Sequence, residues 1–229
     1  MTSTLAAVPG FAARLKEATQ ADHTAAEGSG FVTALLAGEL PRTAYADLLA
    51  QTHAIYAVLE EAAEAQADSP EVRPFLHPGL ARLPALEADL AFLLGPGWRR
   101  EQLTVPATER YVARLREVAF DWPAGLVAHH YLRYLGDLSG GQIIRRLVGR
   151  TFDLEQDGVR FYVFDQIPKP KPFKDAYRAA LDAAPWGAAE QDRVIAEVSL
   201  AFRLNADVFA DLGTRHGRGG SRPGLNHLA

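Results

Sequence analysis

The sequence predicts an all-α protein that folds as a single-domain helical bundle. Ala, Leu, Arg and Glu dominate the composition, while clusters of β-branched residues are rare, and this favours helix over strand. Apolar residues recur at helical spacing in nearly every long segment. The stretch FYVF at 161–164 is a candidate strand, but it has no second strand with which to pair. With 229 residues, 48% of them hydrophobic, the chain suits one domain with a sizeable core.

The first half of the chain is expected to form a series of helices. A helix over 11–27 precedes a short one over 31–38, which a glycine ends. The residues at 69–71 combine a serine cap, a proline and an acid, which is typical of a helix start, and another helix is expected over 79–95. The long segment 42–67 carries apolar side chains at helical spacing. These are Tyr45, Leu48, Leu49, Ile55, Tyr56 and Leu59.

The second half is expected to continue the same pattern. A helix over 106–120 starts at a proline, which is favoured at the first helical position. A long helix with glycines in its middle is expected over about 124–150, followed by a region at 151–170 that is mostly loop. Helices over 171–184 and 189–212 complete a bundle.

The folded domain is expected to span residues 11–212. Residues 1–10 are expected to be a flexible N-terminus. Residues 213–229 are rich in Gly and Arg and poor in apolar residues, so we expect a disordered tail there.

Composition excludes several classes of protein. A net charge of -4 and a pI of about 6.0 argue against a dedicated nucleic-acid binder. No apolar run approaches the ~20 residues that a membrane span needs, and the N-terminus has no secretory pattern, so we expect no membrane association and a cytoplasmic protein. The absence of cysteine excludes disulfides, iron–sulfur clusters and thiolate catalysis. Phosphate-loop, dinucleotide, serine-hydrolase and H-E-x-x-H motifs are also absent, and a helical enzyme without them most often borrows its chemistry from a cofactor.

The glycines of the segment HHYLRYLGDLSGGQIIRRLVGR (129–150) need an explanation. Gly136, Gly140 and Gly141 each weaken a helix interior by about 1 kcal/mol relative to Ala. They could allow close packing of another helix or a kink, or they could bring bare backbone against a flat ligand. Asp137 lies among them, and taken alone such a carboxylate is more often a solvated surface group than the anchor of a water network.

The first helix favours the ligand. A lone helical histidine such as His23 is more often structural than a metal ligand. However, Lys16 lies almost two turns before it, roughly 10 Å along the axis, and Glu27 lies one turn after it. An imidazole with a cation at that distance suits a large planar cofactor that carries carboxylates at its rim, and haem fits this description.

Four segments together resemble the haem oxygenase family, in its bacterial soluble form. The segment LKEATQADHTAAE is similar to the family's proximal helix, and HHYLRYLGDLSGGQ to its distal helix. PFKDAYR and AFRLNADVF match later helices, so the resemblance covers about residues 11 to 212. It implies a helical fold in which haem b lies between a proximal helix and a kinked distal helix.

The resemblance also implies roles for individual residues. His23 is expected to be the axial iron ligand, with Glu27 orienting its ring. Gly136 and Gly140 would bring backbone against the haem face. Asp137 would hold distal waters, and the expected members of its network are Tyr56, Arg133 and Asn205. The remaining expected haem contacts are Lys16, Tyr131, Ser139, Lys174, Arg178 and Phe202.

The implied reaction is the oxidative cleavage of haem to biliverdin, carbon monoxide and ferrous iron. Haem would be both prosthetic group and substrate, and ferric hydroperoxide would attack a meso carbon of the ring. Dioxygen and electrons from an external ferredoxin or flavin-dependent reductase would be needed. Lys16, Arg133, Lys174 and Arg178 could dock an acidic donor or could serve the propionates alone, and a monomer is expected.

Two other functions stay open at this point. A haem-storage protein would bind haem without turning it over, and a helical interaction module would use the glycines only as a kink. The other histidines lack partners at metal-ligand spacing, so we interpret them as structural, exposed or part of the tail. They are His53, His77, His129, His130, His216 and His227.

Overall fold

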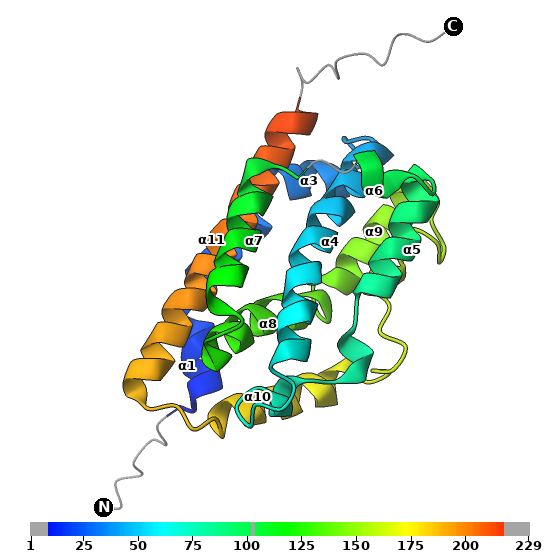
Figure 1. Cartoon of the computed structure of the whole chain (residues 1–229). Coiled ribbons are helices and arrows are strands. Elements are labelled where there is room, and N and C mark those ends of the chain that lie inside the picture. Colours follow the sequence, from blue (N-terminus) through cyan, green and yellow to red (C-terminus); the bar gives the residue numbers. More distant parts are fainter. Residues whose placement is uncertain (1–8, 102–103, 218–229) are drawn as a thin grey trace, which may run out of the picture.

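The computed structural model describes residues 9–101 and 104–217, with the side chains of Glu27 and Glu101 left undescribed (Figure 1). Within these ranges the chain is helical and has no β-strand, so the all-α prediction is confirmed. The FYVF stretch begins in a short 3-10 helix, η3, instead of a strand. The helices are α1 Phe11–Ala18, α2 Gln20–Glu27, α3 Gly30–Leu36, α4 Arg42–Ala65, η1 Arg73–Phe75, η2 Pro78–Leu80, α5 Leu83–Leu94, α6 Trp98–Glu101, α7 Pro106–Val118, α8 Pro123–Asp137, α9 Gly141–Phe152, η3 Arg160–Tyr162, α10 Pro170–Asp182 and α11 Ala188–His216.

The first expected helix, 11–27, is divided at Thr19 into α1 and α2. The Thr19 hydroxyl donates to the carbonyl of Leu15 at 2.8 Å, and such back-bonding bends helices. Backbone hydrogen bonds still cross the junction, since the N–H of His23 donates to Thr19 O at 3.0 Å. Lys16 and His23 therefore lie on separate helices, because the backbone leaves helical geometry at Thr19.

The glycine-containing helix expected over 124–150 is two helices. The first, α8, ends at Asp137, and α9 begins at Gly141, so Leu138, Ser139 and Gly140 separate them. We call these three residues the distal break. The Ser139 hydroxyl donates to Leu135 O at 2.7 Å, which competes with a continuous helical ladder. The expected kink is therefore a three-residue break between two helices, which the backbone hydrogen bond from Gly140 N–H to Gly136 O, at 2.8 Å, still bridges.

Helix α11 organises the bundle. It packs against α7 and α8, and also against α2 and α3, and α3 lies beside its C-terminal end (Figure 1). Helix α4 packs against α5, α7 and α8 from another side. The core between them is apolar, and it fully buries Tyr45, Leu49, Leu59, Tyr111 and Leu126.

The C-terminal boundary differs from the expected one. Helix α11 continues to His216, four residues beyond the expected end at 212. Asp47 of α4 holds this last turn, because its carboxylate pairs with Arg215 at 3.0 Å and with His216 at 2.9 Å. The expected flexible N-terminus falls largely on residues 1–8 and the expected tail on 218–229, and both of these ranges lie outside the described residues.

The loop around η3 is tied to the bundle by two buried side chains. Asp89 accepts hydrogen bonds from the backbone N–H groups of Arg160, at 3.0 Å, and Phe161, at 2.8 Å. The guanidinium of Arg82 donates to Phe161 O and to Val163 O at 2.6 Å. These bonds satisfy backbone groups that a loop would otherwise leave unpaired. Among the described residues, no helix is both long enough and apolar enough to cross a bilayer.

Candidate active site

His23 lies on α2, where it faces α11. Its side chain is half-buried, and its ring meets the Phe202 ring edge-on, with centroids 5.4 Å apart. Asp22, the preceding residue, pairs with Arg203, the residue after Phe202, at 3.4 Å. The ring contact and the ion pair together fix the orientation of α2 on α11. Lys16 is exposed on α1, and Glu27 ends α2, but the side chain of Glu27 lies outside the described part of the chain.

The three glycines of the α8–α9 region have different surroundings. A Cβ added to Gly136 would meet no atom within 4 Å, and one added to Gly140 would meet only Gly136 O, at 3.7 Å. A Cβ at Gly141 would lie 3.0 Å from the Tyr162 ring. Gly141 is thus a packing glycine, while Gly136 and Gly140 border open space. The packing explanation therefore applies to Gly141, while the open space beside Gly136 and Gly140 leaves room for a flat ligand.

Asp137 is half-buried between Gly136 and the distal break, so it is no ordinary surface carboxylate. It accepts a hydrogen bond from the Tyr56 hydroxyl. Burial raises the pKa of Asp137 above its usual value, while Arg133, Tyr56 and Arg82 act in the opposite direction. The pKa of Tyr56 is raised as well, first by burial and then by Asp137. A carboxylate in this setting holds a proton more readily than one in water.

Arg133 joins the same group. It lies one turn before Asp137 on α8, it is buried, and its Nη1 donates to Asn205 Oδ1 at 2.8 Å. Its guanidinium carbon lies 5.2 Å from the centre of the Tyr56 ring. Burial disfavours the charge of Arg133, but Asp137 and Tyr56 outweigh it, so the pKa of Arg133 is raised. Tyr56, Arg133, Asp137 and Asn205 therefore form one cluster, built from α4, α8 and α11.

A second group lies at the start of α10. The Lys174 ammonium donates to Ser139 Oγ at 2.9 Å, across from the distal break. Arg178 pairs with Asp175 at 3.0 Å. Burial lowers the pKa of Lys174, and the positive charge of Arg178 lowers it further. Tyr131 is half-buried close enough to Arg178 for that charge to oppose the rise in its pKa that burial causes. Cations and hydroxyls thus gather beside the distal break.

Sequence reasoning missed Tyr111 and the role of His129. Tyr111 is fully buried on α7, its hydroxyl has no hydrogen-bond partner among the described residues, and burial raises its pKa to about 12. His129 is fully buried and its Nε2 lies 2.9 Å from Glu197, which in turn pairs with Arg114 at 2.6 Å. Because these residues come from α7, α8 and α11, no local spacing reveals them. The one available signal is that His129 lies four residues before Arg133, on the same face of α8.

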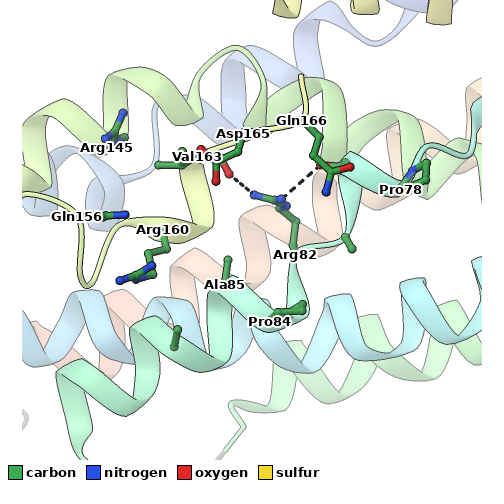
Figure 2. Close-up of a pocket in the computed structure, with 13 residues that line it drawn as sticks. Pro78, Arg82, Pro84, Ala85, Arg145, Gln156, Arg160, Val163, Asp165 and Gln166 are labelled. Carbon is green, nitrogen blue, oxygen red and sulfur yellow. Dashed lines mark hydrogen bonds between the residues drawn. The ribbon is translucent and has the colours of Figure 1, made fainter. Parts of the chain in front are cut away.

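Two cavities lie elsewhere on the molecule. The larger, about 580 Å³, lies between the start of α5, Arg145 of α9 and the loop around Asp165 (Figure 2). Figure 2 shows that Arg82 lines it, but hydrogen bonds to Val163 O and Gly79 O occupy this guanidinium. A second cavity of about 490 Å³ lies beside α9. Neither is lined by a residue of the expected site.

Comparison with known proteins gives consistent matches along the chain. The family described as "Heme oxygenase" matches residues 9–211. Heme oxygenase 1 of Synechocystis sp. is 38% identical over 201 residues, which cover 88% of this chain and 84% of that protein. Heme oxygenase 1 of Homo sapiens is 40% identical over 201 residues, which cover 86% of this chain and 70% of that protein. The two identities are similar, so they do not separate bacterial from animal relatives.

Comparison of the folds indicates the same family as comparison of the sequences. The crystal structure of heme oxygenase-1 from Synechocystis sp. in complex with heme superposes with a TM-score of 0.86 at 37% identity, over 90% of this chain and 94% of that one. From the family match, the relatives and the shared fold together, we conclude that the chain belongs to the haem oxygenase family of haem-degrading oxidoreductases.

Proposed function

We propose that this protein cleaves haem b to biliverdin, carbon monoxide and ferrous iron, using dioxygen and electrons from an external donor. The observation that carries the proposal is the cluster of Asp137, Tyr56, Arg133 and Asn205 next to Gly136, whose missing side chain leaves open space. A proton-holding carboxylate beside a bare stretch of backbone suits oxygen chemistry on a flat ligand.

The available donors fit haem better than a bare iron ion. Within the described residues, no group of three or more His, Asp or Glu side chains could hold a metal ion. One imidazole suffices when a porphyrin supplies the other iron ligands. His23 would hold the iron, and its edge contact with Phe202 would set the ring orientation. When bound, haem supplies both the iron that activates oxygen and the ring that is opened at a meso carbon.

Asp137 would accept and return a proton in this site. Its Oδ2 already accepts from Tyr56, which leaves Oδ1 to accept from a water and return a proton through it. Arg133 would align the group and limit the rise of its pKa, and it is itself held by Asn205. Gly136 and Gly140 carry no side chains, so the space beside them would stay open to the flat ligand and to water.

The cations at the rim would bind the haem propionates. Lys174 and Arg178 lie one turn apart on α10, and Tyr131 and Ser139 adjoin them. Lys16 is exposed on α1 and is the expected cation from the proximal side. The exposed cations of this group could also bind an acidic ferredoxin or a flavin-dependent reductase as electron donor. A monomer and a cytoplasmic location stay predictions, tested by sedimentation and by cell fractionation.

The test is a visible spectrum of the purified protein with one equivalent of hemin, followed under air with a reductant. We expect a Soret band that then decays as a broad red-absorbing biliverdin band grows. A Soret band that persists, with a ferredoxin system as well as with a chemical reductant, would instead support haem storage. If no Soret band forms, the proposal fails and the helical interaction module becomes the better explanation.

A further inference from the structure

Ser139 connects two elements that border the site. It lies in the distal break between α8 and α9, where its hydroxyl donates to Leu135 O at 2.7 Å. The same oxygen accepts from the Lys174 ammonium of α10 at 2.9 Å. A hydroxyl has one donor and two acceptor positions, so the donor is fully used and Lys174 occupies one of the acceptor positions. One side chain thus joins the backbone above the site to a cation at its edge.

Lys174 is held without a negative partner. The nearby carboxylate of Asp175 is already paired with Lys171, at 2.6 Å, and with Arg178, at 3.0 Å. Among the described residues, the ammonium of Lys174 pairs with no carboxylate, and its hydrogen-bond acceptor is the neutral Ser139 hydroxyl. Burial and the charge of Arg178 both lower the pKa of Lys174, while the carboxylate of Asp175, which makes no ion pair with it, opposes them only in part. Its charge is therefore available to an incoming carboxylate.

The rotation of a planar ring in this site must be set at its edge. An axial bond to His23 lies along the rotation axis, so it does not resist turning of the ring in its own plane. The backbone at Gly136 and Gly140 cannot resist this turning either, because the two residues carry no side chains. A free lysine is a poor edge anchor, because its flexible stem has about 2 kcal/mol of rotamer freedom. Ser139 removes part of that freedom before any ligand binds.

We propose that Ser139 is a positioning residue: by holding Lys174 against the distal break, it sets how haem is rotated beneath that break, and so which meso carbon is attacked. This inference rests on the proposed function. Lys171 lies three residues before Lys174 on the same helix, but its side chain is exposed and pairs with Asp175. It therefore provides a matched control cation.

The experiment compares hemin complexes of the wild type, Ser139→Ala, Ser139→Thr, Lys174→Ala and Lys171→Ala. The proton NMR spectrum of each cyanide-bound ferric complex counts the in-plane orientations through the haem methyl resonances. Chromatography of the biliverdin isomers then reports the carbon attacked. We expect Ser139→Ala to keep the Soret band but to shift the orientation ratio about fivefold, the size expected for one hydrogen bond. Lys174→Ala should shift it in the same direction, Ser139→Thr should restore it, and Lys171→Ala should leave it unchanged.

The double variant Ser139→Ala/Lys174→Ala separates coupling from coincidence. If Ser139 acts through Lys174, the double variant shifts no further than Lys174→Ala alone. Additive shifts, or a single unchanged orientation in Ser139→Ala, would overturn the proposal. If wild-type protein binds hemin but yields no biliverdin, the proposed reaction fails, while the NMR comparison still decides the role of Ser139. Should Ser139→Ala not fold, Ser139→Thr and Lys174→Ala carry the same comparison.

Discussion

The Asp137 carboxyl group is subject to two opposing influences. Burial raises its pKa, while Arg133, the Tyr56 hydroxyl and Arg82 lower it. The outcome is a raised pKa, so the group exchanges a proton at a pH nearer neutrality than a surface aspartate does. Each neighbour therefore affects the pKa of Asp137 as well as the position of its carboxyl group.

Replacement of Asp137 should separate binding from chemistry. In Asp137→Asn we expect hemin to bind with nearly unchanged affinity, because the side chain keeps its size. Biliverdin formation should fall about 100-fold or more, because the amide cannot exchange a proton. A hemin titration and a timed biliverdin assay measure the two effects. Asp165→Asn, a change at an exposed aspartate of the 580 Å³ cavity, is the control. Undiminished biliverdin formation in Asp137→Asn would remove Asp137 from the mechanism.

His23 should be the iron ligand. His23→Ala should lose the imidazole-bound Soret spectrum, and added imidazole should restore it by filling the space that the side chain leaves. His53→Ala serves as a control, since that ring packs on Trp98 and lies 3.5 Å from Glu87. Unchanged iron coordination in His23→Ala, measured by resonance Raman spectroscopy, would show that the ligand is another residue.

At the scale of the element, Gly136 lowers the stability of α8 while it serves the proposed function of that helix. Gly136 has no positive φ, and an added Cβ would meet open space, so alanine fits there in the haem-free protein. Gly125, on the same helix, is different, because its Cβ would lie 2.3 Å from the Trp122 ring. Gly125 thus serves packing, while Gly136 leaves room for the haem proposed above.

This difference gives opposite expectations for two alanine variants. Gly136→Ala should raise the free energy of unfolding by up to about 1 kcal/mol, because alanine favours helix. It should also weaken hemin binding and slow turnover by obstructing the face. Gly125→Ala should instead lose about 1–3 kcal/mol through overpacking against Trp122. Urea unfolding and hemin titration measure both properties. Normal hemin binding and turnover in Gly136→Ala would mean that close backbone approach is not required.

The elements show where local sequence stops being informative. Helix spacing predicted most of the helices, but α1 and α2 separate at Thr19 because a hydroxyl bonds back to Leu15. The glycine run predicted a kink, yet the different roles of Gly136 and Gly141 depend on Tyr162, which reaches Gly141 from η3. The contact between Ser139 and Lys174 joins residues 35 apart along the chain. Contacts of this kind arise from packing and have no local pattern.

Across the whole molecule, acid sensitivity should come from histidines buried in the neutral form. His130 is buried on α8 and its Nδ1 lies 2.9 Å from the Tyr177 hydroxyl. Burial lowers the pKa of His130 to about 3. Burial also lowers the pKa of His129, although Glu197 opposes this. The resemblance predicts haem-site residues, but it provides no reason to expect this second, structural use of histidine.

The sign of the pH effect follows from proton binding. The native state keeps His130 neutral, while the unfolded chain takes up a proton below about pH 6.5. Stability is therefore complete above that pH and is lost as the pH falls toward 3. Between pH 7 and pH 5, His130 alone should remove about 2 kcal/mol from the free energy of unfolding.

A double variant tests this expectation in the haem-free protein. His130→Phe/Tyr177→Phe removes both hydrogen-bonding partners and nearly keeps their shape, so stability at pH 7 should change little. Urea unfolding at pH 7 and pH 5 should show that the variant loses about 2 kcal/mol less than the wild type over this range. Equal losses in both proteins would assign the acid sensitivity to other groups.

Helix α11 carries partners of both sides of the site within a single turn. Phe202 meets His23, and three residues later Asn205 accepts from Arg133. Local opening of that turn would release both contacts together, so the two sides belong to one cooperative unfolding unit. Amide hydrogens on this turn should therefore exchange as a group and slow together when hemin binds. Haem uptake and formation of the hydrogen bond between Arg133 and Asn205 would then both depend on the same local opening equilibrium of α11.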